Sequence, residues 1–520
     1  MDKQIQRTRR NTLGDLLTRT VARYPKKRAF LYKDLDITYE ELDMLVNQTA
    51  NGLWHDGVKK GDRLAVLSKN NLDFVIVTFA LARIGAVMVP MNYMLKEKDI
   101  AYILKDAQVI GMFAEKEFIT VLDDASDGLE IRHRFVLESL ETPVSDVWML
   151  LDELQKSQPI DHVEESILDD DLAHVLYTSG TESDPKGVML SHKSIMHEYA
   201  SCIIDGYMDV NDMFVHALPF YHSAQLHVFL GPSIYIGATG IILDVASPEK
   251  IMETIERYGA NQLFAPPTVW IAMLRHPTFD AFNLSTLEKC YYGAAIMPRE
   301  VLKELTDRLP NAKFWNFYGQ TEVAPLATAL QPEDQLRKLG SAGKPALHVE
   351  TKIVDDDGLE VARGEIGEIV HRTPHAMIGY WNNPEKTAEA FQNGWFHSGD
   401  LGVMDEEGYI TIVDRKKDMI NTGGINVASR EVEEVIYEMK EVAEVAVIGV
   451  QDDYWIEAIA AVIVQKDGET VEEEAVIEFC KAVLPSFKVP KQIHYVEQLP
   501  KNPSGKVLKK DLRDKFQQMN

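Results

Sequence analysis

A loop rich in hydroxyl groups and glycine follows an apolar run in the first half of the chain. The run Ala173-His174-Val175-Leu176 is typical of a strand, and residues 177–187 after it read Tyr-Thr-Ser-Gly-Thr-Glu-Ser-Asp-Pro-Lys-Gly. Glycine lets a backbone approach an anion, amides and hydroxyls donate hydrogen bonds to phosphate oxygens, and lysine neutralises charge. The spacing is not that of a Walker A loop. The loop therefore predicts another kind of phosphate site, with a plain surface turn as the alternative.

An alternation of helices and strands must position this loop. Residues 37–42 predict a short strand and then a helix, capped by Thr38 with Glu41 at the capping-box position. Residues 63–67 and 86–90 predict buried strands on either side of a helix over 71–81. The alternation returns where a strand at 241–243 precedes a helix that begins near Pro248. This βαβ pattern predicts a mostly parallel sheet with helices on both faces.

The pattern changes in the second half of the chain. Between about 335 and 413, helical periodicity is weak apart from a stretch after Pro384, and Asp/Glu-Gly turns at 355–358 and 405–408 separate short strands. We expect a small β-subdomain there. Later segments predict a compact α/β unit; its helices are expected over 431–439 and 471–484, and its strands over 445–450 and 459–464.

The expected fold is α/β, with a large N-terminal domain and a small mobile C-terminal α+β domain. The large domain, residues 1–413, would hold two parallel-type αβα subdomains and the β-subdomain. Residues 414–418, Asp-Arg-Lys-Lys-Asp, would form a hinge, with a solvated linker as the alternative, and residues 419–520 would form the small domain.

Composition limits the classes of function. The chain has 81 acidic and 54 basic residues, which gives a net charge of −27. This overall negative charge argues against binding to nucleic acid or to an anionic membrane. The cysteines, Cys202, Cys290 and Cys480, lie far apart without metal-ligand spacing, which favours a reducing compartment. Arg83 and Pro90 interrupt the most apolar stretch, so we expect no membrane span and no secretory signal. We expect a cytoplasmic protein; a homodimer is left open.

Five segments together resemble the adenylate-forming superfamily, which includes acyl-CoA synthetases, firefly-type luciferases and peptide-synthetase adenylation domains. The first is the phosphate loop. The others, in chain order, are Tyr318-Gly319-Gln320-Thr321-Glu322, Trp395-Phe396-His397-Ser398-Gly399-Asp400-Leu401-Gly402, Asp414-Arg415-Lys416-Lys417-Asp418-Met419-Ile420 and Pro500-Lys501-Asn502-Pro503-Ser504-Gly505-Lys506. They occur in the family's order over about residues 25–515, and the motif set looks most like bacterial fatty-acyl-CoA synthetases.

The resemblance implies that a carboxylate attacks the α-phosphorus of ATP, which gives an acyl-adenylate and pyrophosphate. Lys506 would bridge the carboxylate and the α-phosphate, Glu322 and Thr178 would hold Mg²⁺, and Asp400 with Arg415 would bind the ribose. The rest of the implied ATP site comprises Ser179, Gly180, Thr181 and Lys186 around the phosphates, Gly293, Ala294, Ala295, Asn316, Phe317 and Tyr318 along the adenine, and Gly319, Gln320 and Thr321 beside Glu322. Glu182 and Ser183 depart from the usual Thr and Gly of the loop, which leaves the role of Glu182 open.

A second half-reaction is implied, in which the CoA thiol displaces AMP. The C-terminal domain of such enzymes rotates, and Lys417 is the hinge residue that the resemblance indicates. Gly423 and Gly424 would leave a channel for the pantetheine arm, with an ordinary tight turn as the alternative. Asn421 stands where luciferase-like relatives carry lysine, which disfavours light emission.

The acid is only partly defined by the sequence. Amino-acid-activating relatives place an aspartate in the stretch that corresponds to residues 216–226, and none is present here, so a substrate ammonium would lack a partner. His222 matches the family's gate beside the acyl pocket, with a core histidine as the alternative. The sequence offers an apolar lining that would suit a medium- or long-chain fatty acid or an aromatic acid; its residues are Phe220, Tyr221, Leu226 and Phe229.

The leading expectation is an ATP-dependent acid–thiol ligase that forms a fatty acyl-CoA and releases AMP. An aryl-CoA synthetase of the coumarate or benzoate kind is one alternative, and a fatty-acyl-AMP ligase that loads a carrier protein is another. A nucleotide sensor without catalysis is disfavoured because Lys506, Glu322 and Asp400 are all present.

Overall fold

The computed structural model describes two compact units. The described residues are 2–138, 147–163, 165–178, 185–293, 295, 297–452, 454–466, 468–501 and 507–517. The larger unit comprises Met1–Gly180, Asp184–Glu350 and Arg372–Gln392, and the smaller one comprises Thr181–Ser183, Thr351–His371 and Asn393–Asn520.

The first sheet of the larger unit carries the strand that leads into the phosphate loop. Its order is β19-β9-β8-β4-β3-β5-β6-β7. The strands are β3 (Arg63–Leu67), β4 (Val87–Met91), β5 (Gly111–Ala114), β6 (His133–Val136), β7 (Met149–Leu150), β8 (Leu172–Thr178), β9 (Lys186–Ser191) and β19 (Gly379–Tyr380). Strands β8, β4, β3, β5, β6 and β7 pair in parallel, whereas β9 is antiparallel to both β8 and β19.

Helices pack on this sheet as the sequence predicts. Thr38 caps α3 with the expected capping box to Glu41, and α4 follows β3 directly. Ala65 and Leu67 share one core with Ile103 of α5. The helices of this region are α1 (Asp2–Arg9), α2 (Leu13–Arg23), α3 (Tyr39–His55), α4 (Leu72–Ile84), α5 (Glu97–Asp106), α6 (Ile119–Ala125) and α7 (Leu151–Gln155), with a 3₁₀ turn η1 (Lys116–Phe118).

The second sheet of the larger unit runs in the order β2-β1-β11-β10-β12-β13-β14-β15-β16. Its strands are β1 (Arg28–Tyr32), β2 (Leu35–Thr38), β10 (Met213–His216), β11 (Thr239–Ile242), β12 (Gln262–Phe264), β13 (Lys289–Gly293), β14 (Lys313–Gly319), β15 (Leu326–Leu330) and β16 (Ser341–Pro345). The helices around it are α8 (His192–Asp205), α9 (Gly231–Ile236), α10 (Pro248–Tyr258), α11 (Pro267–Leu274), α12 (Arg299–Arg308) and α13 (Pro384–Ala390), with shorter turns η2 (Ala224–Leu230), η3 (Phe279–Ala281), η4 (Thr321–Val323) and η5 (Pro332–Asp334).

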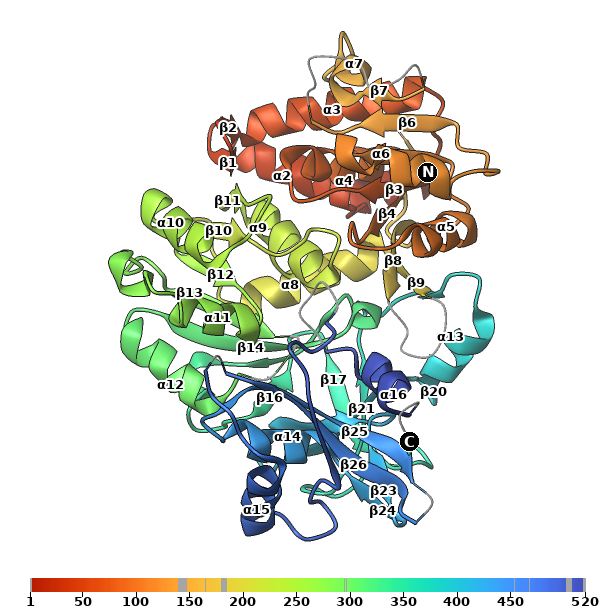
Figure 1. Cartoon of the computed structure of the whole chain (residues 1–520). Helices are drawn as coiled ribbons and strands as arrows, with labels where there is room; N and C mark the ends of the chain where they lie inside the picture. Colours follow the sequence, from red (N-terminus) through yellow and green to blue (C-terminus); the bar gives the residue numbers. More distant parts are fainter. Residues whose placement is uncertain are drawn as a thin grey trace. The chain divides into compact units, whose positions relative to one another are not determined.

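Both faces of this sheet are covered because side chains alternate along each strand. Val215 of β10 packs with α10, α11 and α12, which lie along one side of β12, β13 and β14 (Figure 1). Phe214, its neighbour, packs on the other face with Cys202 of α8 and Phe229 of η2. This arrangement, together with the similar known structures described below, confirms the predicted α/β layers.

The smaller unit contains two sheets. One is ordered β17-β18-β21-β22, with β17 (Glu350–Val354), β18 (Gly367–Arg372), β21 (Trp395–Met404) and β22 (Ile410–Arg415). The other is ordered β24-β23-β26-β25, with β27 beside β26; its strands are β23 (Ile420–Thr422), β24 (Ile425–Val427), β25 (Val442–Asp452), β26 (Ile456–Gln465) and β27 (Gln492–Tyr495). Helices α14 (Ser429–Tyr437) and α15 (Glu473–Val483) pack on one face of this sheet and α16 (Lys509–Gln517) on the other.

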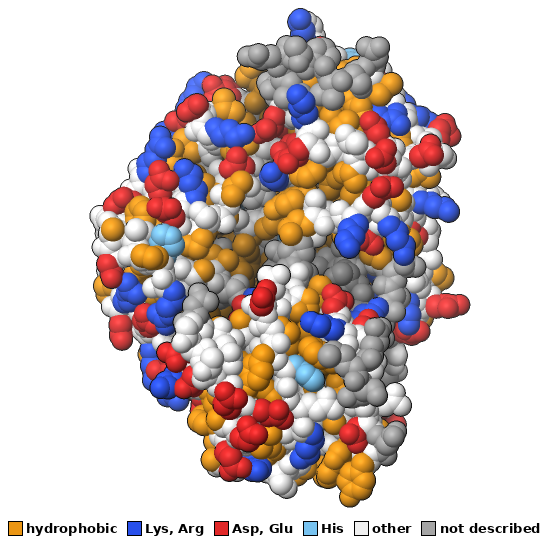
Figure 2. Space-filling view, viewed as in Figure 1, with side chains coloured by type: hydrophobic (Ala, Val, Ile, Leu, Met, Phe, Trp, Pro, Cys, Tyr) orange, Lys and Arg blue, Asp and Glu red, His pale blue; other side chains and the backbone are white. Residues whose placement is uncertain are grey.

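The division into units differs from the division expected from the sequence. Residues 351–371 and 393–413 cluster with the C-terminal residues, whereas the expected boundary puts them in the large domain. These units are defined by packing and not by motion, so the hinge at 414–418 stays a prediction. Among the described residues, no helix is long and apolar enough to cross a bilayer. Figure 2 shows acidic and basic side chains interspersed over the face in view, with acidic residues in excess overall.

Buried histidines predict a loss of stability in mild acid. Burial lowers the pKa of His216 and His227 to about 3, and that of His192 and His375 to about 4. The unfolded chain, with histidine pKa values near ~6.5, binds these protons first, so each group destabilises the fold by about 1.4 kcal/mol per pH unit as the pH falls from 6.5 towards the folded pKa. We expect the urea midpoint to fall steeply between pH ~7 and ~5.

Tryptophan fluorescence during urea unfolding would measure this slope. His216→Gln removes one such group and is expected to flatten the dependence, whereas His55→Gln changes an exposed ring and should leave it unaltered. Equal urea midpoints at neutral and mildly acidic pH would contradict the burial of neutral histidines.

Candidate active site

A β-hairpin holds the two ends of the predicted phosphate loop opposite each other. Thr178 of β8 pairs with Lys186 of β9, and the Thr178 hydroxyl lies 3.5 Å from the Lys186 carbonyl oxygen. A Cβ on Gly187 would come within 2.8 Å of Val175 Cγ1, so the close approach of the strands requires glycine there. The predicted ligands Ser179, Gly180 and Thr181, and also Glu182, lie outside the described residues.

A tyrosine joins Lys186 to the predicted metal ligand Glu322. The hydroxyl of Tyr380 donates a hydrogen bond of 2.9 Å to Glu322 Oε1, and Lys186 Nζ lies 4.6 Å from the centroid of the Tyr380 ring. Tyr380 reaches this position because β19 pairs with β9, Tyr380 opposite Val188. The structure thus brings together two predicted site residues, and it adds a third that the sequence analysis missed.

The Glu322 segment suits a hard cation that takes most of its ligands from the substrate and from water. Glu322 is half-buried in η4, and its second carboxylate oxygen accepts no hydrogen bond from a described residue. Thr178 offers a hydroxyl oxygen, the donor type that Mg²⁺ prefers. No cluster of three or more His, Cys, Asp or Glu side chains in the described parts of the chain is arranged to hold a metal. These residues fit a magnesium ion carried by phosphates and do not form a protein cage.

A buried carboxyl group, that of Glu198, helps to hold the loop that carries Glu322. Glu198 Oε1 accepts a hydrogen bond of 2.9 Å from Leu326 N, and its Oε2 lies 3.3 Å from His375 Nδ1. His375 Nδ1 also donates to the Val323 carbonyl oxygen at 2.6 Å. Burial raises the pKa of Glu198 well above its usual range. The pair anchors both ends of the segment 323–326.

The predicted adenine slot lies at the carboxyl ends of two parallel strands. Gly293 of β13 pairs with Phe317 of β14, and a Cβ on Gly293 would lie 2.4 Å from the Phe317 carbonyl oxygen. The Phe317 ring points into the core, and Asn316 Nδ2 donates to Ser341 O at 3.0 Å. Tyr318 is half-buried, and its side chain alternates with that of Phe317.

The structure also describes several other residues that are predicted to bind ATP. Ala295 is exposed in the short segment after β13, and Ala294 lies outside the described residues. A Cβ on Gly319 would lie 1.7 Å from Pro325 O, so the backbone passes too closely for any other residue. The Gln320 side-chain Nε2 is buried and has no hydrogen-bond partner among the described residues.

His222 lies at the entrance to a π-helical turn. Its Nδ1 accepts a hydrogen bond of 3.2 Å from Ala224 N, and Thr321, next to Glu322, bonds to the neighbouring Ser223 through their hydroxyls at 2.9 Å. π-Helical segments are rare and occur often at functional sites. Of the predicted apolar lining, Tyr221 is half-buried, while the fully buried members are part of the core; these are Phe220, Leu226 and Phe229.

The smaller unit brings together the two residues predicted to bind ribose. Asp400 of β21 pairs directly with Arg415 of β22, and Arg415 Nε lies 3.3 Å from Asp400 Oδ1. The next turn, which holds Lys417, is fastened on both sides. Asp414 Oδ2 accepts hydrogen bonds from Ser429 N and Oγ at 2.6 and 2.7 Å, and Arg513 forms an ion pair with Asp418.

The glycine pair after the hinge forms a two-residue turn between β23 and β24. Thr422 pairs with Ile425, and Gly423 and Gly424 have φ of +61° and +85°. Positive φ at both central residues defines a tight hairpin turn of the primed kind, which explains the glycines without a ligand. The Gly423 amide donates to Trp455 O at 2.6 Å. Lys506 lies outside the described residues.

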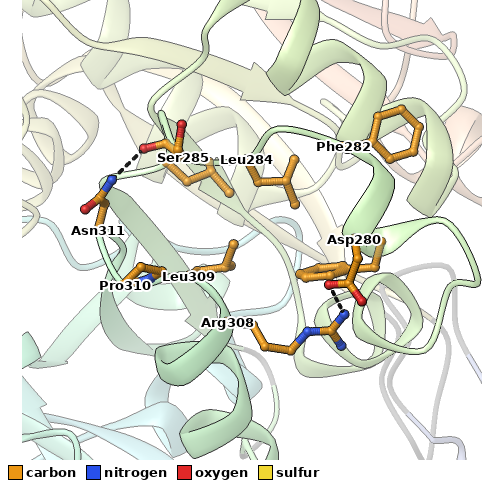
Figure 3. Close-up of a pocket in the computed structure, with 10 residues that line it drawn as sticks. Asp280, Phe282, Leu284, Ser285, Arg308, Leu309, Pro310 and Asn311 are labelled. Carbon is orange, nitrogen blue, oxygen red and sulfur yellow. Dashed lines mark hydrogen bonds and ion pairs between the residues drawn. The ribbon is translucent and has the colours of Figure 1, made fainter.

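A small pocket elsewhere in the larger unit is not part of this site. It has a volume of about 180 Å³ and is lined by residues of η3, α12 and the segments beside them (Figure 3). Arg308 lies at the edge of the pocket and over the Phe279 ring. Its guanidinium already forms an ion pair with Asp280 at 2.6 Å. Typical small-molecule sites enclose about 300 Å³ or more.

Family comparison identifies the class of enzyme. The model of the AMP-binding enzyme family matches residues 17–381, and that of the AMP-binding enzyme C-terminal domain matches residues 431–506. The chain belongs to the AMP-binding enzyme family, and the predicted resemblance to adenylate-forming enzymes is confirmed.

Similar proteins extend over nearly the whole chain. A feruloyl-CoA synthase of Amycolatopsis sp is 32% identical over 508 residues, 98% of this chain and 100% of that protein. The long-chain-fatty-acid–CoA ligase FadD13 of Mycobacterium tuberculosis is 32% identical over 511 residues, 97% of this chain and 98% of that one. The crystal structure of ATP-bound MatB from Rhodopseudomonas palustris has a TM-score of 0.90 at 29% identity and covers 98% of this chain and 100% of that chain. These matches confirm the predicted fold class and the predicted enzyme class, an AMP-forming acid–thiol ligase.

Proposed function

We propose that this protein is an ATP-dependent acyl-CoA synthetase that activates a medium- or long-chain fatty acid. The carboxylate attacks the α-phosphorus of ATP, pyrophosphate leaves, and the CoA sulfur then attacks the acyl carbonyl carbon, which expels AMP. The observation that carries the proposal is the cluster of Lys186, Tyr380 and Glu322 at the mouth of the β8–β9 hairpin. A cation and a carboxylate held at a phosphate loop are the groups that a Mg-nucleotide requires.

The residue roles in this proposal follow the resemblance to the adenylate-forming superfamily. Thr178, Lys186 and the loop between them would bind the β- and γ-phosphates. Thr178 and Glu322 would hold Mg²⁺, which neutralises phosphate charge when bound. Asp400 would accept hydrogen bonds from the ribose hydroxyls, and Arg415 would orient Asp400. Lys506 would supply positive charge where two anions meet in the transition state.

The proposed acid has an apolar tail without a charged end. Residues 216–226 contain no acidic side chain, so a substrate ammonium there would lack a carboxylate. His222 would face the acyl group at the start of η2. The long-chain-fatty-acid–CoA ligase among the relatives supports this choice.

An aromatic acid is the second candidate, and the rings around Phe229 favour it. Phe229 stacks on Phe264 with 4.4 Å between ring centroids, and Phe264 Cε2 lies 3.9 Å from a Cβ built on Gly293. Phe229 belongs to the predicted acyl lining, and a stack of rings there would suit a planar acyl group. The name of the feruloyl-CoA synthase among the relatives indicates an aromatic acid as the substrate of that enzyme.

An acid panel tests the proposal. AMP and thioester would be measured with octanoate, palmitate, benzoate and ferulate, each with and without CoA. Highest kcat/KM with a fatty acid and dependence on CoA would support the proposed function, and preference for ferulate or benzoate would favour the second candidate. AMP release that ignores CoA but requires a phosphopantetheinylated carrier protein would instead favour a carrier-loading ligase.

A further inference from the structure

The side chain of Tyr380 stands between the two charged groups of the proposed phosphate site. The side chain is 7% exposed. Its hydroxyl donates a hydrogen bond to Glu322 Oε1 at 2.9 Å, and Lys186 Nζ lies over its ring, 4.6 Å from the centroid. Glu322 is 58 residues away in the sequence. One aromatic side chain therefore contacts both a cation and a carboxylate.

The spacing matters because a lysine and a glutamate at close range would otherwise neutralise each other. In the part of the chain that the structure describes, Lys186 forms no ion pair with a carboxylate within 4.0 Å, and neither does Glu322 with a cation. A cation over a ring face is stabilised without a counter-charge. Lys186 and Glu322 therefore each contact Tyr380, the ammonium through the ring and the carboxylate through the hydroxyl.

The backbone of Tyr380 is held by contacts that do not involve its side chain. Tyr380 N donates to Thr387 Oγ1 at 2.9 Å, and Trp381 N and Ile378 N donate to the carbonyl oxygens of Gly187 and Met189 at 2.7 and 2.8 Å. These bonds fix β19 on β9. A hydroxyl donates and a carboxylate accepts, so the hydroxyl of Tyr380 is the donor in its hydrogen bond to Glu322.

We propose that Tyr380 is a positioning residue that holds Glu322 and Lys186 apart in the geometry that binds a metal–nucleotide complex. The inference rests on the proposed function of this site. Loss of the hydroxyl would free Glu322 to turn towards Lys186, and the resulting ion pair would remove both the carboxylate from the cation and the ammonium from the phosphates. Loss of the ring as well would leave Lys186 without its support.

Two variants separate these contributions. Tyr380→Phe removes the hydroxyl and keeps the ring, and Tyr380→Leu removes both. Groups that orient a metal ligand typically change metal affinity by about 10- to 100-fold. We expect Tyr380→Phe to raise the Mg²⁺ concentration for half-maximal AMP formation about 10-fold, with the KM for the acid unchanged. Tyr380→Leu is expected to weaken, in addition, the binding of ATP in EDTA.

Calorimetric titration with ATP, in Mg²⁺ and in EDTA, gives a readout that needs no turnover. Tyr32→Phe is the matched control, since Tyr32 is also buried and donates to a carboxylate, Glu138, at 2.5 Å on a strand outside the site. The proposal predicts weaker MgATP binding in Tyr380→Phe and unchanged binding in Tyr32→Phe. Similar losses of Tm in both variants with wild-type MgATP binding would overturn the positioning role. MgATP binding by wild type without AMP from any acid would overturn the proposed function alone, and absence of MgATP binding would overturn both.

Discussion

Lys506→Ala is expected to lower the rate of acyl-adenylate formation by about 10²- to 10³-fold and to leave thioester formation from supplied acyl-adenylate nearly unchanged. The first step brings a carboxylate against a phosphate, and positive charge placed between them acts mainly in the transition state. The second step joins a thiol to an already activated carbonyl and does not meet this repulsion. ATP–pyrophosphate exchange measures the first step, and mixing enzyme, CoA and prepared acyl-adenylate measures the second.

A neighbouring lysine provides the control for this variant. Lys501 lies in the same segment, but its ammonium forms an ion pair with Glu444 at 2.6 Å. Lys501→Ala removes the same charge from the same segment, and we expect both half-reactions to stay near wild type. Equal loss of both half-reactions in Lys506→Ala would count against a C-terminal domain that alternates between two roles.

Gly423→Leu is expected to show the opposite selectivity, with thioester formation reduced by about 10²-fold and adenylate formation preserved. A Cβ at Gly423 would lie 3.3 Å from Cε3 of Trp455, and the longer leucine side chain would extend from this tight turn into the proposed pantetheine path. ATP–pyrophosphate exchange does not require that path. The same two assays therefore separate the variants in opposite directions.

The backbone cost of the leucine needs its own control, because Gly423 has φ of +61°. Gly468 has φ of +79° with no atom within 4 Å of a built Cβ, and it lies in the same unit. Gly468→Leu imposes a similar strain in open space. If it reduced thioester formation as much as Gly423→Leu does, the loss would reflect the stability of the unit and not a blocked channel.

Local signals predicted much of the fold. The capping box at Thr38 and Glu41, the strand over 63–67 and the helix that starts at Pro248 all appear as expected. Each depends on residues within a few positions of one another, so the sequence alone is sufficient to specify it. Helix ends were less accurate, since α4 runs on to Ile84 before Gly85 ends it in a left-handed conformation.

Pairing between distant segments could not be predicted in this way. The strand β9 after the phosphate loop was missed; it is antiparallel to β8, the strand before the loop. Tyr380 reaches Glu322 only through the pairing of β19 with β9, and Glu198 reaches His375 from a separate helix. Hydrogen bonds across such distances leave no local pattern, and a lone tyrosine in a loop carries no signal of its own.

The candidate site was predicted by motif and not by geometry. Asp400 and Arg415 were expected to act together, and they face each other across one antiparallel pair. Asn316 and Phe317 were both expected to line the adenine slot, yet the side chain of one bonds to Ser341 and that of the other lies in the core. Their contribution to nucleotide binding would then come through the backbone, which a list of residue types does not reveal.

The fate of the carboxylate oxygens tests the central claim most directly. Acid labelled with ¹⁸O in both carboxylate oxygens would be converted with ATP and CoA, and the products analysed by mass spectrometry. Attack of the carboxylate on the α-phosphorus predicts one ¹⁸O atom in AMP and one in the thioester carbonyl. Unlabelled AMP, or label in inorganic phosphate, would contradict an acyl-adenylate intermediate.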